Sequence, residues 1–177
     1  MKLSGILLLT CALAAGCGGD DTPSTPSTST PNTITFTATL LPANEVAPNN
    51  VTNAEASGRG SAIITFNLTR NSAGAIQSGT VDFHYDLTAF PAGTLITLSH
   101  IHTGTSAVSG AVLISTGQSS ASTLGLTSGA GSWEAKGITS ADAATLQSII
   151  DTPANFYFNV HSSTNPSGVA RGQLVKQ

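Results

Sequence analysis

From Thr33 onward, apolar side chains alternate with polar ones, many of them threonines. Ile34, Phe36, Ala38 and Leu40 occupy every second position of the first such stretch. Successive side chains of an extended strand point to opposite faces, so a period of two predicts strands with one face buried. A helix repeats its faces every 3.6 residues or so and cannot sort such a pattern onto two sides.

The same alternation, punctuated by turn residues, predicts about eight or nine short strands. Residues 139–151 break the rhythm and predict one short helix near 140–150, with Thr139 or Ser140 as its cap and Asp142 at its positive end. We therefore expect an all-β fold, a Greek-key β-sandwich or a flattened barrel. The predicted strands cover residues 33–40, 58–70, 80–88, 95–103, 110–116, 121–127, 131–136, 155–162 and 169–176.

Only 8% of the residues are charged, against about 25% in an ordinary soluble domain. The formal net charge is −3. Binding to nucleic acid requires a basic face that neutralises phosphates, so this class of partner is excluded. Residues 33–177 are long enough for one hydrophobic core but not for two. No Ser-His-Asp order, phosphate-binding glycine loop or pair of carboxylates supports hydrolase chemistry.

The first 16 residues have the layout of a secretory signal: one lysine, an apolar run, then small residues before Cys17. The end of this segment resembles a bacterial lipobox, which predicts cleavage before Cys17 and lipidation of that cysteine. Ordinary cleavage, with Cys17 left as an incidental thiol, is the alternative. Cys11 lies inside the signal, so a mature chain has no cysteine pair for an internal disulfide.

Residues 17–32 are rich in serine, threonine and proline and contain no large apolar side chain, which predicts a flexible tether. Gly18, rather than aspartate, follows Cys17. In lipoproteins of Gram-negative bacteria an aspartate there resembles an inner-membrane retention signal. We therefore expect an exported protein anchored by lipid to the outer membrane, its partner there being the membrane itself.

Three of the four histidines lie in two short motifs, His100-Ile101-His102 and Val160-His161. Residues i and i+2 of a strand share a face about 6.6 Å apart, so His100 and His102 could chelate one ion. If the strand of His161 adjoins theirs, three nitrogens converge, which suits copper or zinc. Alternatively, the imidazoles simply bond to backbone groups. His84 shares its face with Asp82 and Asp86 and is expected in solvent.

Three groups of short motifs are distinctive. They are LPANEV at 41–46 with ASG at 56–58, HIHTG at 100–104 with GAV at 110–112, and FNVHS at 158–162 with NPSG at 165–168 and RGQL at 171–174. On these motifs, nearly all of residues 34–175 resemble the CHRD family, the chordin-type domain found in many exported bacterial proteins. Three departures from the family pattern are Ala47 inserted before Pro48, Ala111 in place of proline, and Val169-Ala170 in place of an acidic-aliphatic pair.

The resemblance implies no particular reaction, so the leading hypothesis is a binding or structural module with a histidine metal site. Copper/zinc superoxide dismutases are a weaker analogy. They place a His-x-His pair, a later histidine and an arginine in the order of His100, His102, His161 and Arg171, which would make Arg171 the anion guide of a copper redox enzyme. Those enzymes also carry a disulfide, together with further histidines and an aspartate for zinc, and the cysteine pair is missing here.

Another interpretation of this C-terminal segment is a turn followed by an edge strand. Gly168 and Gly172 would then serve turn geometry, and Arg171 would pair with Glu45 or Asp151.

Overall fold

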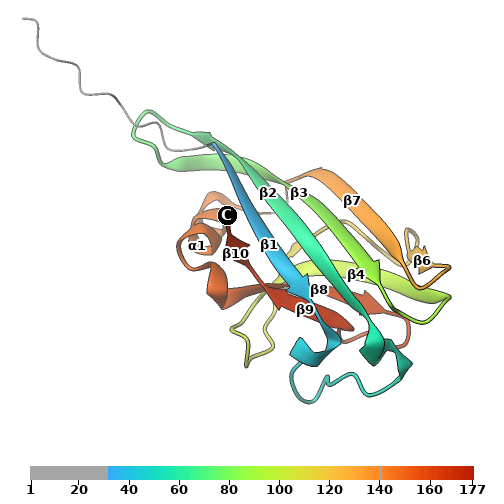
Figure 1. Ribbon diagram of the computed structural model, residues 1–177. Helices are drawn as coiled ribbons and strands as arrows, with labels where there is room; N and C mark the ends of the chain where they lie inside the picture. Colours follow the sequence, from blue (N-terminus) through green and yellow to red (C-terminus); the bar gives the residue numbers. More distant parts are fainter. Residues whose placement is uncertain (1–31, 140) are drawn as a thin grey trace, which may run out of the picture.

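The computed structural model describes residues 32–139 and 141–177, which form two antiparallel five-stranded sheets and one short α-helix (Figure 1). The predicted signal segment 1–16, Cys17, residues 17–31 of the predicted tether and Ser140 lie outside the described residues. None of the helices in the described ranges has the length and apolarity needed to cross a membrane.

The first sheet has the strand order β10-β1-β2-β3-β7, and the second has the order β5-β4-β8-β9, with β6 pairing to the start of β4. The first sheet comprises β1 (Thr33–Leu40), β2 (Arg59–Arg70), β3 (Ile76–Thr88), β7 (Gly131–Ile138) and β10 (Val175–Lys176). The second comprises β4 (Thr94–Thr103), β5 (Val112–Ser115), β6 (Leu124–Leu126), β8 (Phe156–Ser162) and β9 (Ala170–Gln173). The helical elements are α1 (Ala143–Asp151) and the 3₁₀ turns η1 (Pro42–Asn44), η2 (Ala54–Ser57) and η3 (Pro153–Asn155).

The predicted all-β sandwich is confirmed, and its two sheets do not close into a barrel. Ten strands appear among the described residues because the predicted strand 169–176 divides at Leu174. Leu174 is buried and its amide donates to the Phe156 carbonyl. The chain thereby leaves the second sheet after β9 and joins β1 of the first sheet as β10.

The predicted helix is present but begins later than residue 139. The side chain of Asp142 accepts a hydrogen bond from the amide of Thr145 at 2.7 Å, so Asp142 is the N-cap. The cap prediction for Thr139 is therefore wrong. A carboxylate at this position accepts a hydrogen bond from an otherwise unpaired amide and lies at the positive end of the helix. These two effects explain why Asp142 is the N-cap.

The main core lies between the sheets, where the apolar halves of the alternating strands meet. Phe36 and Phe66 pack within the first sheet with ring centroids 5.0 Å apart. Phe83 of β3 stacks on Phe158 of β8 at 5.9 Å, across the two layers. Removing such apolar surface from water is the main favourable term in folding.

β8 departs from the pattern because all of its residues are buried, on both faces. Phe156, Phe158 and Val160 belong to the main core. The alternate residues, including Tyr157 and His161, lie on the opposite face of the second sheet. Loops cover this face: residues 104–111 bond to His102 and Arg171, and residues 163–169 bond to His161. Glu45, from residues 41–58, lies close to Arg171 and Asn159 on the same face. We call this buried outer face of the second sheet, with the loops over it, the polar layer.

The two sheets are also joined at one edge by reciprocal backbone hydrogen bonds between Leu41 and Arg171. Gly168 has a φ of +135°, as expected for a turn glycine. The turn prediction for Gly172 is wrong, because Gly172 lies within β9. A Cβ atom at Gly172 would collide with the backbone of Thr39 in β1. Glycine is required there by the close approach of two strands.

We predict that Gly172→Ala lowers the free energy of unfolding by roughly 1–3 kcal/mol, because the added methyl group has no space. Gly125→Ala is the matched control, since a Cβ atom at this strand glycine meets nothing within 4 Å. Urea unfolding of both variants measures the difference. Equal midpoints for Gly172→Ala and Gly125→Ala would contradict the packing of β9 on β1.

Candidate metal centre

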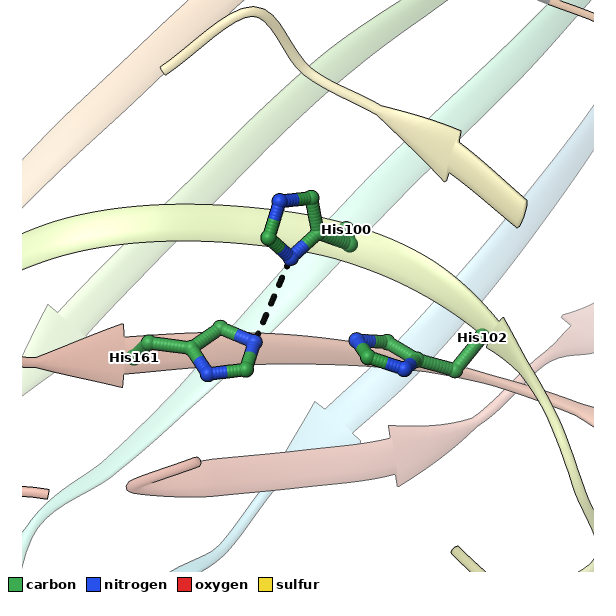
Figure 2. Close-up of side chains that lie close together, drawn as sticks. All are labelled: His100, His102 and His161. Atoms are coloured by element: carbon green, nitrogen blue, oxygen red, sulfur yellow. Dashed lines mark hydrogen bonds between the residues drawn. The ribbon is translucent and has the colours of Figure 1, made fainter. Parts of the chain in front are cut away.

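The structure brings His100, His102 and His161 together in the polar layer (Figure 2). β4 and β8 are antiparallel neighbours, and His161 lies opposite Leu98, two residues before His100. Nδ1 of His100 lies 3.3 Å from Nε2 of His161. Ligand nitrogens of all three side chains lie within 4.8 Å of one another. The convergence predicted from sequence is therefore present.

Two of the rings have a fixed tautomer. Nδ1 of His102 lies 3.1 Å from the carbonyl oxygen of Gly110, and Nδ1 of His161 lies 3.0 Å from that of Pro166. A carbonyl only accepts, so each Nδ1 carries the proton and each Nε2 keeps its lone pair. Hydrogen bonding to the backbone is the alternative explanation for these histidines. In His102 and His161 it uses only one of the two ring nitrogens.

The second nitrogen of His102 has no partner at all. Its Nε2 atom is buried and makes no hydrogen bond, and Figure 2 shows it facing His161. An unpaired polar atom in a buried site costs free energy, because the hydrogen bonds it made to water are not replaced. The geometry thus leaves an electron-pair donor aimed at the other two rings.

The spacing of the nitrogens fits a metal ion. Two nitrogens bound to one tetrahedral ion at about 2.0–2.1 Å are about 3.3 Å apart, which is the distance between the nitrogens of His100 and His161. With all three ligand atoms within 4.8 Å, a common point lies at most about 2.8 Å from each. Small rotations of the side chains would complete three bonds, with a fourth position left for another ligand.

The site favours neutral imidazoles. Burial lowers the pKa of His100 to about 4, helped by the neighbouring His161 and His102. Burial also lowers the pKa of His161 to about 4, against the opposing hydrogen bond to Pro166. The pKa of His102 is lowered by burial and by the charge of Arg171. A metal binds the neutral form of histidine, so no ring needs to lose a net positive charge at neutral pH. Because Nε2 of His161 is unprotonated, Nδ1 of His100 donates the hydrogen bond between them. That proton would move to Nε2 of His100 when Nδ1 binds the ion.

Arg171 lies in the same layer but is not an ion-pair partner of the carboxylates proposed for it. It is 1% exposed, and its Cζ atom lies 3.5 Å from the centroid of the Tyr157 ring. Its guanidinium donates to the carbonyls of Thr105 and Val108 and to the side chain of Gln173. Among the described residues, neither Glu45 nor Asp151 forms a salt bridge with it.

Glu45 lies close to this arginine without bonding to it. Its carboxylate oxygens are buried and have no hydrogen-bond partner, like Oδ1 of Asn159. Burial raises the pKa of Glu45 to about 7, although the charge of Arg171 acts in the opposite direction. Glu45, Arg171 and Gln173 line a pocket of about 390 Å³ at the edge of the polar layer.

Tyr157 is the member of the layer that the sequence analysis missed. Its ring stacks on His102 with centroids 4.9 Å apart and planes 9° from parallel. The sequence spacing could have identified it: Tyr157 lies four residues before His161 on one strand, which puts both side chains on the same face. The side chain of His84, by contrast, lies in the first sheet and is 43% exposed, in keeping with the solvent-facing position expected from the sequence. It also pairs with Asp86 at 3.0 Å.

These pKa shifts predict how the stability of the metal-free protein depends on pH. Between pH 6.5 and about 4 the unfolded chain protonates His100 and His161 while the folded chain does not. Stability must therefore fall with falling pH, by on the order of 1 kcal/mol per pH unit for each histidine. Glu45 acts in reverse, because its raised pKa lets the folded chain keep a proton between pH 4.5 and about 7.

Urea unfolding at several pH values tests this dependence. His161→Gln should make the rise of stability with pH shallower, and Glu45→Gln should make it steeper. A slope that neither substitution changes would show that these groups ionise alike in the folded and unfolded chains.

The described sheets and the histidine cluster lie within a region that matches a known protein family. The family model of the CHRD domain matches residues 36–174. No curated protein and no solved structure matches the chain. The match spans both sheets and includes His100, His102, His161 and Arg171. The chain belongs to the CHRD domain family.

Proposed function

We propose that this protein is an exported binding module that holds one transition-metal ion, copper or zinc, through His100, His102 and His161. One observation carries the proposal: the buried Nε2 atom of His102 has no partner and faces the other two imidazoles (Figure 2). A bound ion would give this lone pair the partner that the protein itself does not supply.

The chemistry of the donors supports copper or zinc. The cluster consists of three imidazoles and contains no carboxylate or thiolate. Imidazole suits zinc and copper, whereas calcium and magnesium prefer oxygen. The carbonyls of Gly110 and Pro166 supply the outer hydrogen bonds that orient metal-binding histidines in known sites.

The alternative function is a copper-dependent redox enzyme that resembles copper/zinc superoxide dismutase. Under this hypothesis Arg171 would attract the anionic substrate to the metal. The guanidinium is instead 1% exposed and bonded to carbonyl oxygens of the loop 104–111. This placement favours the binding module over the enzyme. A copper-loaded protein without superoxide-dependent activity would leave storage, delivery or structural roles.

The lipid anchor at Cys17 and the tether of residues 17–32 would hold this module at the outer membrane of a Gram-negative bacterium. Both proposals rest on the sequence alone. A tether after a lipidated cysteine would let the domain clear the lipid headgroups.

We predict that the metal-free wild-type protein, purified without a histidine tag, binds one Cu(II) or Zn(II) ion and becomes more stable to heat. At a free metal concentration about 100 times the Kd, linkage gives roughly 2.7 kcal/mol of stabilisation, or several degrees in Tm. Titration calorimetry and thermal unfolding measure the two effects. His100→Ala/His161→Ala should abolish both.

His84→Ala is the matched control, since it also removes one histidine but lies on the first sheet and outside the cluster. It should bind like the wild type. Metal binding that survives in His100→Ala/His161→Ala, or that is lost equally in His84→Ala, would contradict the assignment of the ligands.

Lipidation of Cys17 can be tested independently of the metal site. Cells that express the wild-type protein should incorporate a palmitate analogue into it, and Cys17→Ser should abolish that labelling. The protein should then move from the membrane fraction to the soluble fraction. Undiminished labelling of Cys17→Ser would disprove lipidation at this cysteine and leave the metal site unaffected.

A further inference from the structure

His102 is held by contacts outside the histidine cluster. Its Nδ1–H donates to the Gly110 carbonyl at 3.1 Å. Its ring lies flat against the ring of Tyr157, with centroids 4.9 Å apart and an angle of 9° between the planes. The hydrogen bond fixes which nitrogen carries the proton, and the stacking fixes the plane of the ring. Neither contact involves another histidine.

Tyr157 and Gly110 also bond to each other, which closes a ring of contacts around His102. The amide of Gly110 donates to the hydroxyl of Tyr157 at 3.3 Å. Gly110 is thus bonded to Tyr157 through its N–H and to His102 through its C=O. A side chain at position 110 would collide with the carbonyl of Thr103, so only glycine lets the loop approach β4 this closely.

Arg171 contacts Tyr157 and the loop of Gly110 from β9, the other strand next to β8. β8 lies between β4 and β9, so Tyr157 has His102 on one neighbour and Arg171 on the other. The guanidinium lies 3.5 Å from the centroid of the Tyr157 ring. It also donates to the carbonyls of Thr105 and Val108, in the loop that carries Gly110. One side chain thereby holds both parts that orient His102.

We propose that Tyr157 and Arg171 are positioning residues, which hold His102 in the tautomer that carries its proton on Nδ1 and presents Nε2 to the metal. The inference rests on the metal site proposed above, but the tautomer itself is a property of the metal-free protein. Arg171 then acts through Tyr157 and the loop 104–111 rather than on a substrate. Its planar guanidinium is needed, because it covers an aromatic ring and bonds to two carbonyls at once.

The test begins with Tyr157→Phe, which removes the hydroxyl bond to Gly110 and keeps the ring. Nitrogen-15 chemical shifts of the imidazoles in the metal-free protein should show His102 in the Nδ1–H tautomer in the wild type. They should show a mixture of tautomers in Tyr157→Phe. The affinity for Zn(II) should fall about 10-fold, within the 10–100-fold range typical of outer hydrogen bonds at metal sites.

Tyr85→Phe is the control for the loss of a buried hydroxyl. Tyr85 is fully buried and donates to Gln118 on the core side of the second sheet. This variant should change neither the tautomer of His102 nor the affinity for Zn(II). Arg171→Lys keeps the positive charge and loses the planar group, and it should lower the affinity at least as much as Tyr157→Phe.

Two results would overturn the inference. One is a wild-type His102 that carries its proton on Nε2 or exchanges between both tautomers. The other is an affinity and a tautomer that respond to Tyr157→Phe no more than to Tyr85→Phe. If the wild type binds no metal while Tyr157→Phe still changes the tautomer of His102, the proposed function fails and the positioning role stands.

Discussion

The burial of β8 on both faces is the constraint on which the site depends. One face belongs to the apolar core, and the other carries Tyr157, Asn159 and His161 under loops. Polar groups removed from water must find partners inside the protein. Carbonyls of Gly110 and Pro166 supply partners for one nitrogen of His102 and one of His161. The Nε2 atoms of His102 and His161 are not used by these carbonyls and lie close to each other and to His100. These nitrogens make the cluster a candidate metal centre.

Three of the charged side chains in the described residues are buried. Glu45, Glu55 and Arg171 are 3%, 5% and 1% exposed, and all three lie in or beside the polar layer. Glu55 accepts hydrogen bonds from Ser162 and Asn165, which hold the loop that carries Pro166. Arg171 holds the loop 104–111 in the same way. In a chain with 8% charged residues, the buried side chains of Glu55 and Arg171 thus fix the loops that orient the histidines.

The sequence predicted the sheets because alternation is a local property of the chain, and it predicted the three histidines because their motifs are short. It missed what depends on contacts between distant segments. Alternation cannot distinguish a polar face in solvent from one covered by loops, so Tyr157 went unnoticed. The close approach of Gly172 to Thr39 joins two strands far apart in the chain. The choice of Asp142 as helix cap depended on which of several adjacent polar residues would meet the free amide of Thr145.

The central claim is that three imidazoles of the polar layer bind one metal ion. X-ray absorption spectroscopy of the metal-loaded protein tests it most directly, because it counts the ligands and measures their distances. We predict three imidazole nitrogens at about 2.0–2.1 Å from zinc, with a fourth light atom completing the shell. A shell with fewer than three imidazoles would contradict the account.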